Sequence, residues 1–74
     1  MSNASCCHRM AAHFATQAAL AATAEECRAY RELEHLWSKM AVLAERFDRE
    51  HDGDVKAQIY AMMGEVQAMR QKVA

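Results

Sequence analysis

The sequence predicts an all-α protein: an antiparallel helical hairpin preceded by an alanine-rich helix, with self-association completing a small helical bundle. Three observations lead to this fold class. The 74 residues contain no proline and two glycines, so little in the chain interrupts a helix. Two segments carry apolar residues at alternating steps of three and four, which is the spacing of one helix face. One polar stretch, residues 51–54, separates those segments.

The two periodic segments predict helices at about 24–51 and 54–73, which together form a hairpin over residues 24–74. The apolar seam of the second helix consists of Val55, Ile59, Met62, Val66, Met69 and Val73. The seam of the first consists of Tyr30, Leu33, Trp37, Met40, Ala44 and Phe47. Because the seams have the same period and the connection is short, the helices should pack antiparallel. Gly53 is expected to end the first helix in the left-handed conformation, and Asp54 to cap the second.

The apolar face of residues 24–51 is wider than one neighbouring helix covers. Ala29, Leu36 and Leu43 lie beside the seam and broaden it. A 74-residue chain also buries little apolar surface by itself. The extra width therefore predicts either that the N-terminal segment packs there as a third helix or that a second copy of the chain does.

Residues 5–22 are rich in alanine, which strongly favours helix. The following Thr23-Ala24-Glu25-Glu26 has the form of a capping box, with Thr23 as N-cap and Glu26 three residues on. This predicts a break near residues 22–25. The alternative is one unbroken helix over residues 5–50. Residues 1–4 are expected to be a disordered terminus or a remnant of tag cleavage.

Composition limits the partners that the chain could have. The formal net charge is −1, and the nine basic residues are interleaved with acids, so no basic stripe for nucleic acid emerges. No apolar run approaches the roughly 20 residues that a membrane span needs. Three cysteines are an odd and sparse set for a secreted disulfide framework. We expect a soluble, cytoplasmic protein with reduced thiols that binds neither nucleic acid nor membrane.

The acidic segment from Asp48 to Val55 resembles the opening of an EF-hand loop, with Asp48, Glu50 and Asp52 in ligand positions. The resemblance ends at Ile59, which stands where the family places a bidentate glutamate. We therefore expect an ordinary acidic turn without calcium.

Two other patterns suggest metal chemistry. Glu32 and His35 have the Glu-x-x-His spacing of di-iron bundles, but both fall on the helix face opposite the seam. A soft-metal or thiol constellation is the alternative function of the chain, and it would use Cys6, Cys7, His8, His13 and Cys27. Its spacing matches no closed metal site, so we expect no bound metal and no cofactor.

Catalytic motifs are lacking in the sequence: it has no nucleophile elbow and no phosphate-binding glycine loop. We therefore expect a non-catalytic protein–protein interaction module, such as a small adaptor, co-chaperone or inhibitor. Its partner is expected to be a different protein, a second copy of the chain in a homodimeric four-helix arrangement, or both. The residues predicted to contact the partner are Leu36, Trp37, Met40, Leu43, Phe47, Met63 and Met69.

Overall fold

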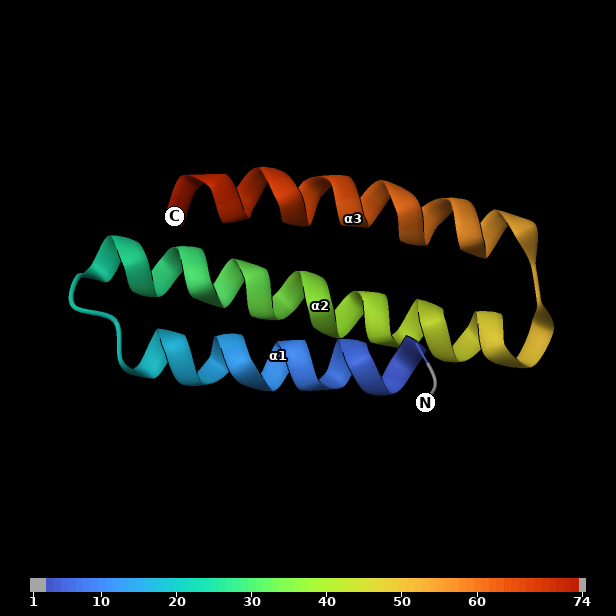
Figure 1. The fold of residues 1–74 in the computed structure, drawn as a ribbon, viewed down its shortest axis with the longest axis horizontal. Coiled ribbons are helices and arrows are strands. Elements are labelled where there is room, and N and C mark those ends of the chain that lie inside the picture. Colours follow the sequence, from blue (N-terminus) through green and yellow to red (C-terminus); the bar gives the residue numbers. More distant parts are fainter. Residues whose placement is uncertain (1–2, 74) are drawn as a thin grey trace.

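The computed structural model describes residues 3–73, and these are all-helical (Figure 1). Helix α1 spans Asn3–Ala19, α2 spans Ala24–Glu50 and α3 spans Gly53–Val73. Helix α1 therefore begins two residues earlier than predicted and includes Asn3 and Ala4, which we had assigned to the terminus. The side chain of Val73 lies outside the described residues.

Helix α2 lies between the other two helices, and both run in the opposite direction to it (Figure 1). No Cα atom of α1 comes within 8 Å of one in α3 among residues 3–73, so α2 carries both helix–helix interfaces. The described chain measures 41 × 20 × 14 Å along its principal axes. The core cluster draws on all three helices and contains Ala4, Cys7, Phe14, Leu33, Met40, Ala41, Ala44 and Val66.

The chain breaks between α1 and α2 at residues 20–23, so the alternative of one unbroken helix is wrong. Thr23 is the N-cap of α2, as predicted, and its hydroxyl accepts a hydrogen bond from the Glu26 amide at 3.1 Å. The Glu26 carboxylate in turn accepts a bond from the amide of Ala22 at 3.3 Å. Local capping and the packing of α1 thus outweigh the helix propensity of the alanines in the connection.

Helix α1 packs against α2 through a face made largely of small residues: Ala4, Cys7, Ala11, Phe14 and Ala18. Small side chains allow two helix backbones to approach closely. Phe14 is the large exception, and its ring stacks on that of Tyr30 with centroids 6.2 Å apart. At the other end of this interface, His8 Nε2 lies 2.8 Å from a carboxylate oxygen of Glu45.

The wide apolar face of α2 is shared between the two flanking helices. Of the broadening residues, Ala29, Leu36 and Leu43 are all half-buried, and Leu36 packs against the core. The N-terminal segment is therefore the third helix on this face. A second copy of the chain is not needed to cover it.

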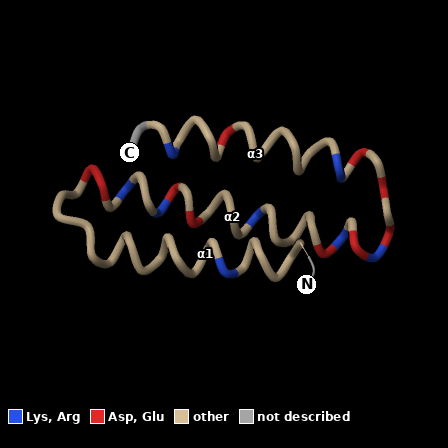
Figure 2. Tube along the Cα trace, viewed as in Figure 1, with Lys and Arg blue, Asp and Glu red and all other residues tan. Residues whose placement is uncertain are grey.

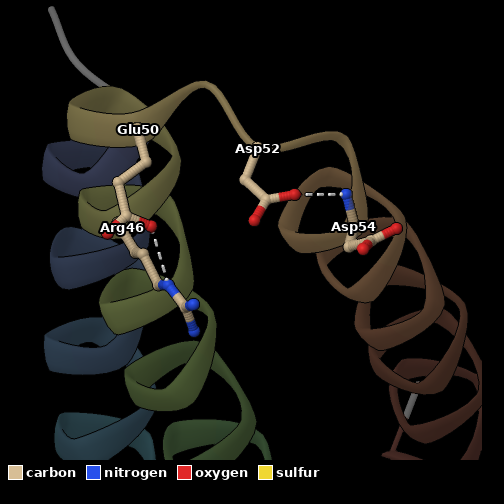
Figure 3. Close-up of polar contacts among 4 residues, drawn as sticks. All are labelled: Arg46, Glu50, Asp52 and Asp54. Atoms are coloured by element: carbon tan, nitrogen blue, oxygen red, sulfur yellow. Dashed lines mark hydrogen bonds and ion pairs between the residues drawn. The ribbon is translucent and has the colours of Figure 1, made fainter.

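The turn between α2 and α3 differs from the prediction in its detail (Figure 3). His51, not Gly53, adopts the left-handed conformation, with φ 52° and ψ 36°, and its amide donates to the carbonyl of Phe47. Gly53 begins α3 and has no positive φ. Asp52 rather than Asp54 caps that helix, because the Asp52 carboxylate accepts a bond from the Asp54 amide at 2.9 Å.

Candidate binding site

The strongest candidate site is an apolar gap between α1 and α3 over the C-terminal half of α2. It has a volume of about 320 Å³, at the lower end of the range for ligand sites. It is lined by Asn3, Cys6 and Cys7 of α1; by Trp37, Met40, Ala44 and Phe47 of α2; and by Lys56, Ile59, Tyr60 and Met63 of α3. We call this set of residues the α1–α3 gap.

The gap exists because α1 offers small side chains toward α3 at its N-terminal end. The α1 residues that line it are Asn3, Cys6 and Cys7, none of which reaches far from the helix axis. The two helices do not approach each other directly. Large side chains of α2 and α3 are therefore left partly uncovered, and Tyr60 and Met63 are 62% and 42% exposed.

Two polar groups in the gap lack a conventional partner. The indole Nε1 of Trp37 is buried and has no hydrogen-bond acceptor among the described residues. Leaving such a donor unpaired costs about 1–3 kcal/mol. The Lys56 ammonium lies 5.9 Å from the centre of the Tyr60 ring, a cation–π contact, and makes no ion pair within residues 3–73.

The gap also contains two thiols in different surroundings. Cys7 is buried, and Cys6 is exposed. Burial first, and the neighbouring Cys6 charge second, raise the pKa of the Cys7 thiol. No histidine, aspartate or glutamate lines the gap to serve as a base for either thiol.

The predicted thiol and metal constellation is not assembled. Cys27 lies near the start of α2, beside the end of α1, whereas Cys6 and Cys7 lie near the start of α1. Because α1 and α2 are antiparallel, these thiols are separated by roughly the part of α1 that follows Cys6, about 20 Å at 1.5 Å per residue. Within residues 3–73 no three His, Cys, Asp or Glu side chains are grouped so that they could hold a metal ion.

The acidic turn that resembles an EF-hand does not follow the course of an EF-hand loop (Figure 3). Asp48 and Glu50 still belong to α2, and α3 has begun at Gly53. The Glu50 carboxylate accepts a bond from Arg46 Nε at 3.0 Å, and that of Asp52 caps α3. These two carboxylates are thus held by groups of the chain itself.

The predicted partner-binding residues fall into three places. Trp37, Met40, Phe47 and Met63 line the α1–α3 gap, but Met40 is only 1% exposed and belongs to the core. Leu36 and Met69 line a second cavity on the other side of α3. Leu43 is half-buried on α2 and lines neither cavity.

The second cavity lies between the N-terminal half of α2 and the C-terminal half of α3. Its volume is about 610 Å³, and it is lined by Arg28, Arg31, Glu32, His35, Leu36, Glu65, Ala68 and Met69. Glu32 and His35 are exposed there. Two arginines and two glutamates surround its apolar residues, so the formal charges of the rim nearly cancel.

Sequence reasoning missed the α1 side of the gap and two residues of α3. Cys6, Cys7 and Asn3 carry no apolar signal large enough to mark a surface. Lys56 and Tyr60 lie outside the seam of α3, where side chains are usually solvated. A signal for Tyr60 did exist, since it stands between Lys56 and Met63 at helical spacing.

Comparisons with known proteins identify no relative: no family model matches the chain, and no curated protein or solved structure is significantly similar to it. None of the described helices is both long and apolar enough to cross a membrane.

Proposed function

We propose that this chain is a non-catalytic protein–protein interaction module, and that the α1–α3 gap receives apolar side chains from a helix of the partner. The observation that carries the proposal is the partly uncovered apolar lining of the gap. Trp37, Phe47 and Ile59 are half-buried, and Tyr60 and Met63 are exposed beside them. A partner helix laid between α1 and α3 would cover these side chains.

The kinds of residue in the gap suit such a contact. Tryptophan and tyrosine are enriched among the residues that contribute most to protein–protein affinity. The flexible methionine side chain adapts to differently shaped partners. A groove between helices that accepts an amphipathic helix is a recurring mode of peptide recognition. An adaptor, a co-chaperone and an inhibitor could each work this way.

A second copy of the chain is a weaker choice of partner. Self-association was expected because α2 has a wide apolar face, but α1 of the same chain packs on that face. Uncovered apolar surface remains in the gap and in the second cavity, and the gap is large enough for a few side chains rather than a long helical seam. We therefore place a different protein in the gap and treat dimerisation as a measurable alternative.

The proposal can be tested with one substitution in the gap and a matched one outside it. Met63→Glu places a carboxylate at an exposed position of the gap, and Val42→Glu does the same at an exposed position of α2 that lines neither cavity. A benzophenone attached to Cys6 would crosslink whatever occupies the gap in host cells. We expect one protein to be crosslinked by the wild type and by Val42→Glu, and to be lost with Met63→Glu. The same crosslinked protein with all three chains would contradict the proposal.

The thiol or metal function is the other class of proposal, and no arrangement of the described side chains favours it. Native mass spectrometry with and without a chelator would reveal it. A zinc or copper adduct that the chelator removes would support it over the docking function.

A further inference from the structure

We infer that the segment docking in the α1–α3 gap is an acidic amphipathic helix, whose carboxylates lie beside its apolar anchors and face Lys56. This inference rests on the proposed function and specifies the chemistry of the partner. It depends on the charges around the gap, on the free ammonium of Lys56 and on the unpaired Trp37 indole.

The residues that line the gap carry no negative charge. Among the lining residues Lys56 is the single formally charged one. Helix α1 contains no acidic residue over Asn3–Ala19, and Arg9 is its one arginine or lysine (Figure 2). Acidic residues of the described chain lie on α2, in the turn that leads to α3 and on α3 itself (Figure 2).

The side of α3 that borders the gap continues this pattern. Lys56, Tyr60 and Met63 are followed at helical spacing by Gln67 and Arg70. This stripe has a cation at each end and no acid; Tyr60, Met63 and the polar Gln67 lie between the cations. A helix lying along it would place its apolar side chains against the middle and its carboxylates near the cations.

Lys56 is available for such a carboxylate. Its ammonium has the Tyr60 ring as neighbour and no ion pair in the described chain. The acidic residues nearest to Lys56 along the chain, Asp52 and Asp54, are poorly placed to pair with its ammonium. The Asp52 carboxylate caps the Asp54 amide, and Asp54 stands two positions before Lys56, so the two side chains leave the helix in different directions.

The unpaired indole N–H of Trp37 also favours a partner that brings hydrogen-bond acceptors into the gap. Its N–H has no acceptor within residues 3–73, although it is shielded from solvent. A partner that places a carboxylate or carbonyl oxygen against the indole would accept that hydrogen bond. A partner rich in acceptors at its anchors therefore relieves a cost that the free protein bears.

A second copy of this chain does not offer the required helix. Its exposed large apolar residues outside the gap are Leu20 and Val42, within the described part of the chain. Leu20 is in the connection after α1 rather than in a helix. Val42 has Lys39, Glu45 and Arg46 as helical neighbours, so a copy would bring two basic side chains and one acidic side chain toward Lys56.

Two synthetic helix-stabilised peptides with the same leucine and phenylalanine anchors test this inference. One carries glutamates beside the anchors, and the other carries lysines. Neither contains tryptophan, so the emission of Trp37, the single tryptophan of the chain, reports occupancy of the gap. We expect the acidic peptide to bind about fivefold more tightly or better at low ionic strength. This preference should shrink in high salt.

Charge reversal at Lys56 is the decisive variant. Lys56→Glu should abolish or invert the preference between the peptides. Lys39→Glu, which makes the same charge change at an exposed site of α2 lining neither cavity, should retain it. Equal affinity for both peptides, or equal effects of the two substitutions, would overturn the acidic partner while leaving the gap as a docking site. No Trp37 response to either peptide up to millimolar concentration would overturn the proposed function as well.

Discussion

Leu33 is the residue on which the packing of α2 depends most clearly. It is 0% exposed and lies in the core cluster that all three helices share. We expect Leu33→Ala to lower the free energy of unfolding by about 2–5 kcal/mol, because it removes buried methyl groups and leaves a cavity. Val42→Ala, at a position of the same helix that is 63% exposed, should change it by less than about 0.5 kcal/mol. Urea denaturation followed by circular dichroism measures both, and equal losses would mean that the heptad register of α2 is misassigned.

The two adjacent thiols of α1 should differ in reactivity. Burial, and then the charge of Cys6, raises the pKa of Cys7 above its ordinary value of 9.0. A raised pKa means less thiolate at a given pH, so Cys7 should react with iodoacetamide more slowly than Cys6 at pH 8. Mass spectrometry of the alkylated peptides would measure this, and denaturant should remove the difference. Comparable rates in the folded protein would show that Cys7 is not shielded.

The same pKa shift links Cys7 to stability. The folded state favours the protonated Cys7 thiol. The contribution of this thiol to the free energy of unfolding is therefore complete below pH 9 and is lost as the pH rises through the higher pKa of the folded state. The urea concentration at the midpoint of denaturation should therefore decrease as the pH is raised above 9. A Cys7→Ser variant should show a smaller fall.

At the scale of the helices, the α2–α3 turn shows what local sequence signals leave open. A glycine near a helix end usually marks the left-handed residue, which is why Gly53 was expected there. The chain instead leaves α2 two residues earlier, at His51. This exit lets Asp52 cap α3 from its N-terminal side.

This turn yields a prediction of opposite sign from the one that the sequence alone would give. A Cβ on Gly53 would meet no atom within 4 Å, and its φ is not positive. Gly53→Ala should therefore stabilise the protein by about 0.4–1 kcal/mol, because alanine restricts the unfolded chain. Thermal denaturation would measure the change. A destabilisation would indicate that Gly53 adopts the left-handed conformation after all. Gly64→Ala within α3 is the control for a helical glycine, since a Cβ there would also meet no atom within 4 Å.

Prediction from sequence worked best where side chains are large. The seams of α2 and α3 were visible because Leu33, Met40, Val55 and Val66 repeat at helical spacing, and all four are buried. The buried face of α1 is mostly alanine, which is a weak apolar signal. Its orientation toward α2 was therefore left open. Trp37, Met40, Phe47 and Met63 of the gap were predicted to contact a partner, but the gap itself was not predicted, since it exists only where the start of α1 lies opposite the start of α3.

For the whole molecule, the position of α1 determines how much apolar surface is exposed. Ala11 is buried at the α1–α2 interface and Ala12 beside it is exposed. We expect Ala11→Glu to detach α1, because an unpaired carboxylate cannot be buried there, and the uncovered face of α2 should then drive dimerisation. Sedimentation equilibrium should give about 8.3 kDa for the wild type and for Ala12→Glu, and about twice that mass for Ala11→Glu. A wild type that already dimerises would support the self-association that the sequence predicts.

Because α1 and α3 each pack on α2 and not on each other, every helix interface joins neighbours in the sequence. Folding then requires only that helices joined by a short connection pack on each other, and no segments far apart in the sequence have to meet. Chains of this kind fold within microseconds to milliseconds. Helix α2 takes part in both docking steps, so it should be the element that is most ordered in the transition state, with α1 and α3 adding to it in either order. Substitutions in α2 would then slow folding, whereas those in the flanking helices would mainly hasten unfolding.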